Sequence, residues 1–106
     1  MRISEQQLFL NSDLTLNTLA RKVGIPARQI SKAVNLTRGC NVSQWINGFR
    51  IGYAQQLLRS TNLPVTEVML EAGFATKSNF HREFMRISGM SPTDYRRSAA
   101  ENPVPD

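Results

Sequence analysis

Residues 73–97 read Gly-Phe-Ala-Thr-Lys-Ser-Asn-Phe-His-Arg-Glu-Phe-Met-Arg-Ile-Ser-Gly-Met-Ser-Pro-Thr-Asp-Tyr-Arg-Arg, and they contain the strongest structural signals in the chain. Phe80, Phe84 and Ile87 follow the spacing i, i+4, i+7. This spacing predicts an amphipathic helix over about residues 77–87 with the three side chains in the core.

Capping residues indicate both ends of this helix and the start of the next one. Thr76 is a candidate N-cap, and Gly89 is placed to end the helix. The run Ser91-Pro92-Thr93-Asp94 supplies a cap, a proline at the first helical position and an acid at the third. It predicts a short last helix that ends near Ser98.

The rest of the chain shows the same helical periodicity, and no segment alternates with period two for long enough to predict a strand. Thr15 and Asn41, the latter with Gln44 three residues later, are candidate N-caps. Gly48 and Gly52 inside the longest predicted helix suggest that another backbone packs closely there. The further predicted helices cover residues 4–9, 16–23, 26–36, 42–60 and 65–72. We therefore predict an all-α chain of about seven helices.

The chain contains an internal repeat. A shift of 49 residues places the apolar positions of helix 16–23 on those of helix 65–72, and Gly24 on Gly73. After one inserted residue, Gly39 falls on Gly89 and Trp45 on Tyr95, so we expect both aromatic residues in the core. Each copy has the order helix, glycine turn, helix, and this order fits a helix-turn-helix or a helical hairpin without a DNA role. In the first copy, Ile30, Ala33 and Val34 are the predicted core side of the second helix.

Composition excludes several classes of protein. The 106 residues, 41% of them hydrophobic, suffice for one domain with a core. No apolar run approaches the ~20 residues of a membrane span. Cys40 and His81 are the only residues of their types, which is too few for an ordinary zinc site. A catalytic Cys–His pair would also need a third group to orient it, and the sequence indicates none. We expect no enzyme, metal, cofactor or small-molecule site in this chain.

The charge distribution points to an anionic partner. The net charge is +5, and residues 14–66 contain seven basic residues and no acidic one. Residues 67–97 contain five basic and four acidic residues. Such a field attracts nucleic acid or an acidic membrane surface, and the first half is expected to dominate phosphate affinity.

The motif Gly73-Phe74-x5-Phe80-x3-Phe84-x4-Gly89-x-Ser91-Pro92-x2-Tyr95-Arg96 resembles the signature of the AraC/XylS family of bacterial transcription regulators. Leu14-x-Leu16-x2-Leu19-Ala20 and Arg50-x3-Ala54-x2-Leu57-Leu58 match as well. The resemblance implies one DNA-binding domain over residues 1–106. It has helix-turn-helix units at 14–40 and 64–98, a linker helix at 41–61 and a tail at 99–106. Both recognition helices are expected in adjacent major grooves of double-stranded DNA.

The resemblance also implies partners and a location. Family members activate or repress transcription, often through RNA polymerase, and most carry a separate sensor or dimerisation region. We expect this chain to be an excised bacterial, cytoplasmic DNA-binding domain of an activator. Pro26 and Val34 depart from the family's usual Ser and Phe. Ser31-x3-Asn35 and Asn47 look like a subgroup with a longer, sometimes membrane-embedded, N-terminal region.

By position in the family, the residues expected to contact bases are Arg28, Ser31, Lys32, Lys77, Ser78 and Arg82. Side-chain chemistry adds Gln29 and Asn79, which suit adenine. The donors and acceptors of all these residues suit guanine and adenine edges in the major groove. The residues expected to contact phosphates, mostly near helix N-termini, are Arg38, Asn41, Ser43, Arg50, Thr76, Ser91 and Thr93. Arg50 has a competing role, in which it pairs with Glu67 or Glu71 and braces the two units.

Two other functions compete with DNA reading. A helical protein-interaction module would contact RNA polymerase or a sensor domain and bind DNA weakly, which the acid-free first half speaks against. A DNA-repair methyl acceptor would use a reactive cysteine, but no motif for that chemistry surrounds Cys40.

Overall fold

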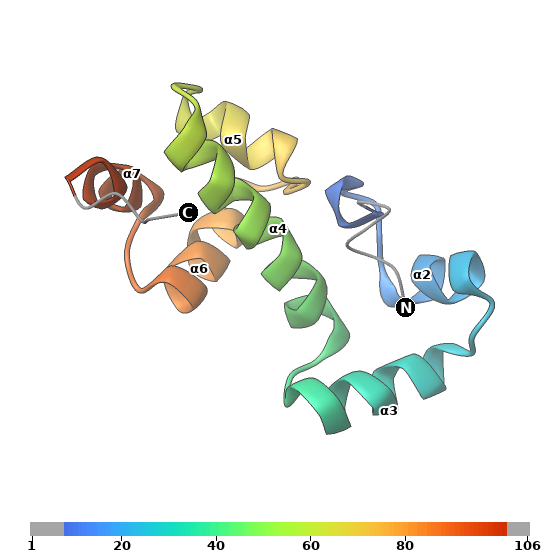
Figure 1. Ribbon diagram of the computed structural model, residues 1–106. Helices are drawn as coiled ribbons and strands as arrows, with labels where there is room; N and C mark the ends of the chain where they lie inside the picture. Colours follow the sequence, from blue (N-terminus) through green and yellow to red (C-terminus); the bar gives the residue numbers. More distant parts are fainter. Residues whose placement is uncertain (1–7, 102–106) are drawn as a thin grey trace.

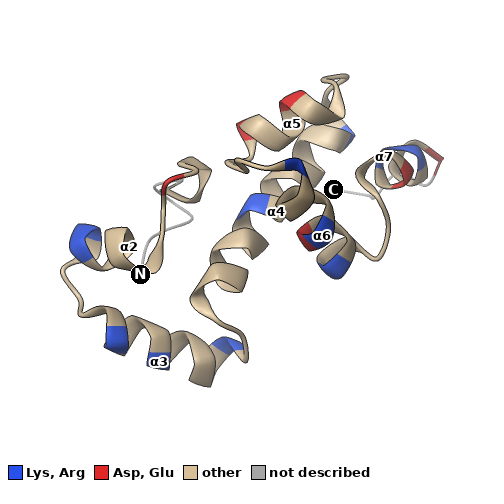
Figure 2. Cartoon of the chain, turned by 180° about the vertical axis from the view of Figure 1, so that it is seen from behind, with Lys and Arg blue, Asp and Glu red and all other residues tan. Residues whose placement is uncertain are grey.

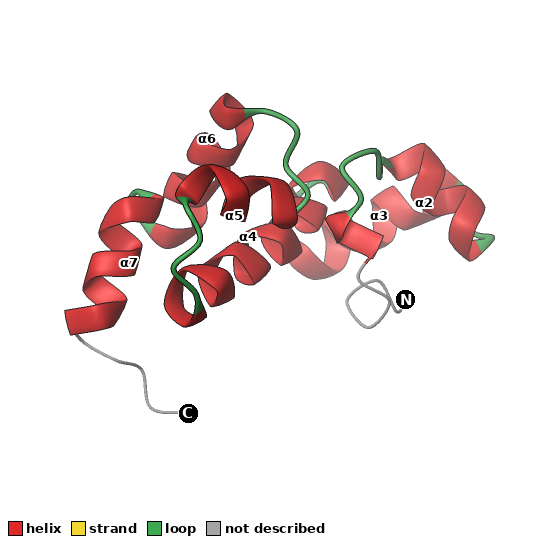
Figure 3. Cartoon of the chain, turned by 90° about the horizontal axis from the view of Figure 1, so that it is seen from above, coloured by secondary structure: helices red, strands yellow, loops and turns green. Residues whose placement is uncertain are grey.

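The computed structural model describes residues 8–101, and in this part of the chain every regular element is helical (Figure 3). The all-α prediction is confirmed. The predicted helix at 4–9 lies mostly outside the described residues, and its end coincides with a short 3-10 helix, η1. The elements are η1 (Leu8–Leu10), α2 (Leu16–Val23), α3 (Ala27–Arg38), α4 (Val42–Ser60), α5 (Val65–Glu71), α6 (Lys77–Ser88) and α7 (Pro92–Glu101).

The long helix α4 runs through the middle of the molecule (Figure 1). Helices α2 and α3 lie on the side where α4 begins, η1 contacts α4 at Arg50, and α5, α6 and α7 pack around the rest of the molecule on the other side. The molecule has two hydrophobic cores. The first is built around Leu19, Ile30 and Ile46, the second around Ile51, Phe80 and Phe84. The described chain extends over 44 × 26 × 24 Å, because the two cores lie side by side along α4.

Local sequence explains most helix ends. The Oδ1 atom of Asn41 accepts a hydrogen bond from the backbone N–H of Gln44, whose side chain accepts one from the N–H of Asn41. This capping box satisfies two of the N–H groups that begin α4. Gly24, the turn residue of the first unit, has φ +72°, in the left-handed region that glycine enters most readily.

Three expectations about packing and helix length were wrong. Ala33 is exposed because α3 buries only the narrow stripe of Ile30 and Val34. Ile87 is 39% exposed because it lies in the last turn of α6, where neighbouring elements cover it incompletely. Helix α7 continues through residues 99–101, since no helix-breaking residue follows Pro92 before Pro103.

The two glycines of α4 do not mark a close approach. A Cβ atom on Gly48 or Gly52 would meet no atom within 4 Å, so the expected contact with another backbone is absent there. Trp45 and Tyr95 are half-buried and pack against the first and second core respectively, as the repeat predicted.

Candidate nucleic-acid interface

Helices α3 and α6 are the second helices of the two helix-turn-helix units. Ile30 and Val34 anchor α3, and Phe80 and Phe84 anchor α6, all of them buried. Each helix therefore turns one face to its core and presents the other to solvent. Lys and Arg residues occur along both helices, whereas the charged residues of α5 are all acidic (Figure 2).

The residues predicted to read bases from α3 lie mostly on its open face. Arg28, Gln29 and Lys32 are exposed, and Ser31 is half-buried. One turn beyond Lys32 lies Leu36, whose 75% exposure is the largest among the exposed large hydrophobic residues. Leu36 was not among the predicted site residues, although its place outside the apolar stripe of Ile30 and Val34 is visible in the sequence.

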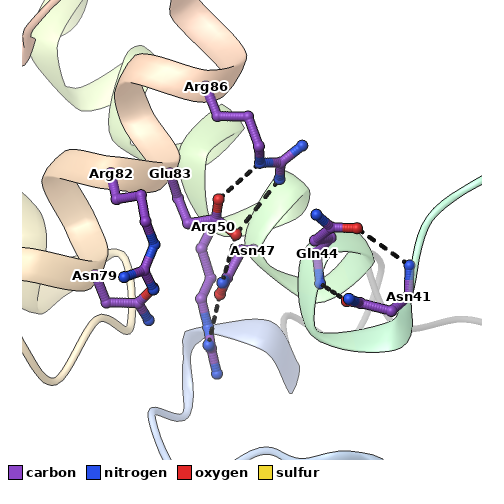
Figure 4. A network of polar contacts seen from close by, with 8 residues as sticks. All are labelled: Asn41, Gln44, Asn47, Arg50, Asn79, Arg82, Glu83 and Arg86. Carbon is purple, nitrogen blue, oxygen red and sulfur yellow. Dashed lines mark hydrogen bonds and ion pairs between the residues drawn. The ribbon is translucent and has the colours of Figure 1, made fainter.

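Helix α6 presents a similar face with one internal contact. Lys77, Ser78 and Arg82 are exposed, and Asn79 is half-buried. The Nη2 atom of Arg82 donates a hydrogen bond of 2.8 Å to Oδ1 of Asn79, as Figure 4 shows. Asn79 thus holds the guanidinium of Arg82 on the open face.

The phosphate candidates lie near several helix ends. Asn41, Ser43, Thr76 and Thr93 are exposed and Ser91 is half-buried. Thr76 Oγ1 accepts from the N–H of Asn79, and Ser91 Oγ accepts from that of Asp94, so both are caps. Arg38 is exposed in the last turn of α3.

An open cleft of about 510 Å³ separates the start of α4 from α6. Its lining brings together residues from both units, namely Leu14, Thr15, Asn41, Ser43, Gln44, Ile46, Asn47, Arg50, Asn79, Arg82, Glu83 and Arg86. The start of a 19-residue helix and two arginines of α6 thus border one concave surface, which favours an anion there.

The structure corrects the expectation that Arg50 pairs with an acid of α5. The residue is 7% exposed, and its guanidinium donates to the carbonyl oxygens of Phe9 and Asn11 at 2.6 and 2.9 Å. Burial lowers the pKa of Arg50. Arg50 pairs with neither Glu67 nor Glu71, which are exposed on α5, and its contact with a phosphate stays a prediction that its burial disfavours. Its bracing role is real, but the partners are backbone carbonyls of the N-terminal segment.

A buried polar pair that the sequence analysis missed joins the two units. Asn47 of α4 donates from Nδ2 to Oε1 of Glu83 on α6 at 3.0 Å, and both residues are 6% exposed. Arg86 donates from Nε to Oε2 of Glu83 at 2.7 Å. The feature in the sequence that could have indicated this pair is Glu83, the acidic residue of a helix whose other charged residues are basic.

The surroundings of Glu83 keep its carboxylate ionised. Burial by itself raises the pKa of Glu83. The hydrogen bonds from Arg86 and Asn47, with the charges of Arg86 and Arg82, outweigh this effect and lower the pKa. The hydrogen bond that Arg86 donates to Glu83 in turn raises the pKa of Arg86.

Residues 8–101 lack the features of two other classes of site. No group of three or more potential metal ligands among His, Cys, Asp and Glu occurs in residues 8–101. Within the same residues, no helix combines the length and apolar character that a membrane span requires.

Comparison with known proteins identifies the fold. The sequence profile described as "Helix-turn-helix domain" matches residues 19–98. The DNA-binding domain of AdpA, a global transcriptional factor, solved with a target DNA, has a TM-score of 0.81 at 26% identity, over 97% of this chain and 91% of that one. The C-terminal domain of AraT, a response regulator from Geobacillus stearothermophilus, has a TM-score of 0.80 at 30% identity, over 92% and 82%. The fold and the two exposed helix faces therefore define a helix-turn-helix DNA-binding domain of the kind found in transcription regulators.

Curated relatives agree and narrow the family. The transcriptional activator NphR of Rhodococcus is 34% identical over 99 residues, which are 93% of this chain and 29% of NphR. The melibiose operon regulatory protein of Escherichia coli is 31% identical over 84 residues, 79% of this chain and 28% of that protein. The chain belongs to the AraC/XylS family of transcription regulators, as a C-terminal-type DNA-binding domain. It spans less than a third of the length of these two relatives, both of which are named as regulators.

Proposed function

We propose that this chain binds a specific sequence of double-stranded DNA and regulates transcription, with α3 and α6 in adjacent turns of the major groove. One observation carries the proposal: α3 and α6 both present exposed basic and polar faces, and α4 packs against both of them. One turn of DNA is about 34 Å long. The described chain extends over 44 Å, so it can present two recognition helices one turn apart.

The exposed side chains have the chemistry of base readers. Arg28 and Lys32 on α3, and Lys77 and Arg82 on α6, suit the O6 and N7 acceptors of guanine. Gln29 suits adenine, and Ser31 and Ser78 suit several bases. Asn79 acts through Arg82 as well as on its own. Leu36 supplies an apolar surface for a thymine methyl group.

Phosphate contacts come from the helix starts and from exposed arginines. Asn41, Ser43, Thr76, Ser91 and Thr93 lie near N-termini, whose free N–H groups and dipoles favour anions. Arg38 adds an exposed charge, and Arg86 joins this set because its side chain is 40% exposed beside the cleft, whereas Arg50 is buried.

The partners beyond DNA follow from the family. RNA polymerase is the partner through which such a domain acts as an activator, and a sensor or dimerisation region controls it. We place the domain in the bacterial cytoplasm, where the DNA is, whether or not the whole protein is anchored to a membrane. The alternative, a protein-interaction module with weak DNA binding, has support in Leu70, 54% exposed between Glu67 and Glu71 on α5.

Selection from random duplex DNA tests the proposal. The expected result is two short conserved blocks about one helical turn apart, bound at least ~10³-fold more tightly than random DNA. The logarithm of the affinity should fall with the logarithm of salt by about 0.9 per phosphate engaged. Weak, salt-sensitive binding without an enriched sequence would favour the protein-interaction module.

A further inference from the structure

The two helix-turn-helix units are joined by few contacts other than α4 itself. Their hydrophobic cores are separate, and Tyr53 of α4 is the residue that packs against both. The cleft of about 510 Å³ lies where α6 faces the start of α4, so apolar packing does not fill that side. The relative position of α3 and α6 therefore depends on α4 and on the specific contacts that cross between the units.

One chain of buried hydrogen bonds makes that crossing (Figure 4). Arg50 donates to the carbonyl oxygens of Phe9 and Asn11 and, from Nη1, to Oδ1 of Asn47 at 3.0 Å. Asn47 then donates from Nδ2 to Oε1 of Glu83, 36 residues further along the chain. Both ends of the Asn47 amide are used, so its orientation is determined by its two partners.

Such a network is rigid for physical reasons. A hydrogen bond is directional, and in a buried site it is stronger than in water. No buried side-chain nitrogen or oxygen in the described part of the chain lacks a partner, and a shift of α6 against α4 would break the hydrogen bond between Asn47 and Glu83. The segment at Phe9 also lies directly on Gly73, in the turn that precedes α6.

We infer that the hydrogen bond between Asn47 and Glu83, held in place by Arg50, sets the spacing between the two recognition helices, and thereby the number of base pairs between the two blocks that the chain reads. The part that concerns DNA rests on the proposed function. Asn47 and Glu83 are positioning residues that determine specificity for spacing. Insertion of one base pair moves a block by about 3.4 Å and turns it by about 35°, which a rigid pair of helices does not follow.

A matched pair of variants isolates this contact. Asn47→Asp has the same shape and still accepts from Arg50, but it places a second carboxylate against Glu83. The double variant Asn47→Asp with Glu83→Gln exchanges donor and acceptor, because the new Gln amide donates to the new Asp carboxylate. Gln56→Ala, at an exposed position of α4, is the control. Circular dichroism establishes that each variant is folded.

The first measurement uses the free protein. Spin labels attached at Ala33→Cys and Met85→Cys, both exposed positions on the recognition helices, report the distance distribution by pulsed electron resonance in a Cys40→Ser background. We expect a narrow distribution for the parent and for Gln56→Ala. The distribution should be at least twice as wide for Asn47→Asp, and the double variant should restore the narrow one.

The second measurement uses the selected DNA and copies with one base pair inserted or removed between the blocks. We expect the affinity of the parent to fall at least 30-fold on either change. The affinity of Asn47→Asp should fall less than 5-fold. The affinity of the double variant should again fall at least 30-fold, as that of the parent does. A mismatched base pair within either block should reduce the affinity of the parent and of every variant by the same factor. The inference would be overturned if Asn47→Asp had the same width of distance distribution as the parent and lost as much affinity as the parent on a change of spacing.

Two remaining outcomes are also decisive. Where Asn47→Asp does not fold, Glu83→Ala takes its place, since it removes the contact without a second carboxylate, and the same expectations apply. A parent that selects one block or none would disprove the proposed function. The distance measurement would then still decide whether Asn47 and Glu83 hold the two helices apart at a fixed spacing.

Discussion

The carbonyl oxygen of Phe9 lies 2.7 Å from the place where a Cβ atom on Gly73 would stand. The N-terminal segment thus lies directly on the turn of the second helix-turn-helix unit, although the ring of Phe9 belongs to the core of the first. Phe9 also stacks on Phe49, with ring centroids 5.6 Å apart. A single short segment therefore contacts both units.

This contact predicts a large effect of Gly73→Ala. The residue has φ +92°, which alone costs an alanine about 1–2 kcal/mol, and the methyl group would also collide with the backbone of Phe9 and Leu10. We expect a loss above about 2 kcal/mol in the free energy of unfolding, measured by urea denaturation.

Gly24→Ala is the matched control for this substitution. Gly24 has φ +72°, but a Cβ atom there meets nothing within 4 Å. Only the cost of the left-handed backbone, about 1–2 kcal/mol, is expected. Equal losses for the two variants would show that the close approach of Phe9 to Gly73 has no energetic consequence.

Arg50→Leu should reduce stability more than it changes the electrostatics of DNA binding. The substitution leaves the carbonyl oxygens of Phe9 and Asn11 without their donor, at a cost on the order of 2–4 kcal/mol. In thermal melts we expect a clearly lower midpoint. At a temperature where the variant is folded, the salt dependence of its affinity should equal that of the parent.

Arg38→Ala is expected to behave in the opposite way. Arg38 is exposed, so its loss should leave the melting midpoint nearly unchanged. It should reduce the slope of log affinity against log salt by about 0.9, the value for one phosphate. A reduced slope in Arg50→Leu would mean that Arg50 also reaches a phosphate.

The ionised state of Glu83 predicts a pH dependence of stability. The carboxylate has a pKa below its ordinary value of 4.5 in the folded chain, so it binds a proton less readily than in the unfolded chain. Its stabilising contribution is therefore complete above about pH 4.5 and is lost as the pH falls through the lower folded value. We expect Glu83→Gln to be less stable than the parent at pH 7, by about 1–2 kcal/mol.

Denaturation curves at a series of pH values between 7 and 2 measure this effect. The difference in the free energy of unfolding between the parent and Glu83→Gln should shrink as the pH falls below 4.5, since the remaining carboxylates are common to both proteins. A difference that is constant with pH would contradict an ionised, stabilised Glu83.

The two units should contribute unequally to binding. Helix α3 carries no acid, whereas Glu83 lies beside Arg82 and Arg86 on α6 and offsets their charge. The double variant Arg28→Ala with Lys32→Ala is expected to lose more affinity than Lys77→Ala with Arg82→Ala. Fluorescence anisotropy at fixed salt compares the two, and equal losses or the reverse order would disprove the asymmetry.

The linear sequence was sufficient for the elements and for the faces of the recognition helices. These are local features, set by residues close together in the sequence. They comprise the helical periodicity, the capping box at Asn41 and the glycine that follows each of the first two helices of each unit. The exposed positions of Arg28, Lys32 and Arg82 follow from the same periodicity, because the opposite side of each helix must be buried.

The tertiary structure alone decided which polar groups meet across the two units. Arg50 has backbone carbonyls about 40 residues away as partners, and Asn47 and Glu83 are 36 residues apart, so no local pattern specifies either contact. Ala33 and Ile87 were misplaced for the same reason, since periodicity shows which way a side chain points but not how far its neighbours extend. Burial of a polar side chain depends on the chain segments that cover it, and those segments come together only in the folded molecule.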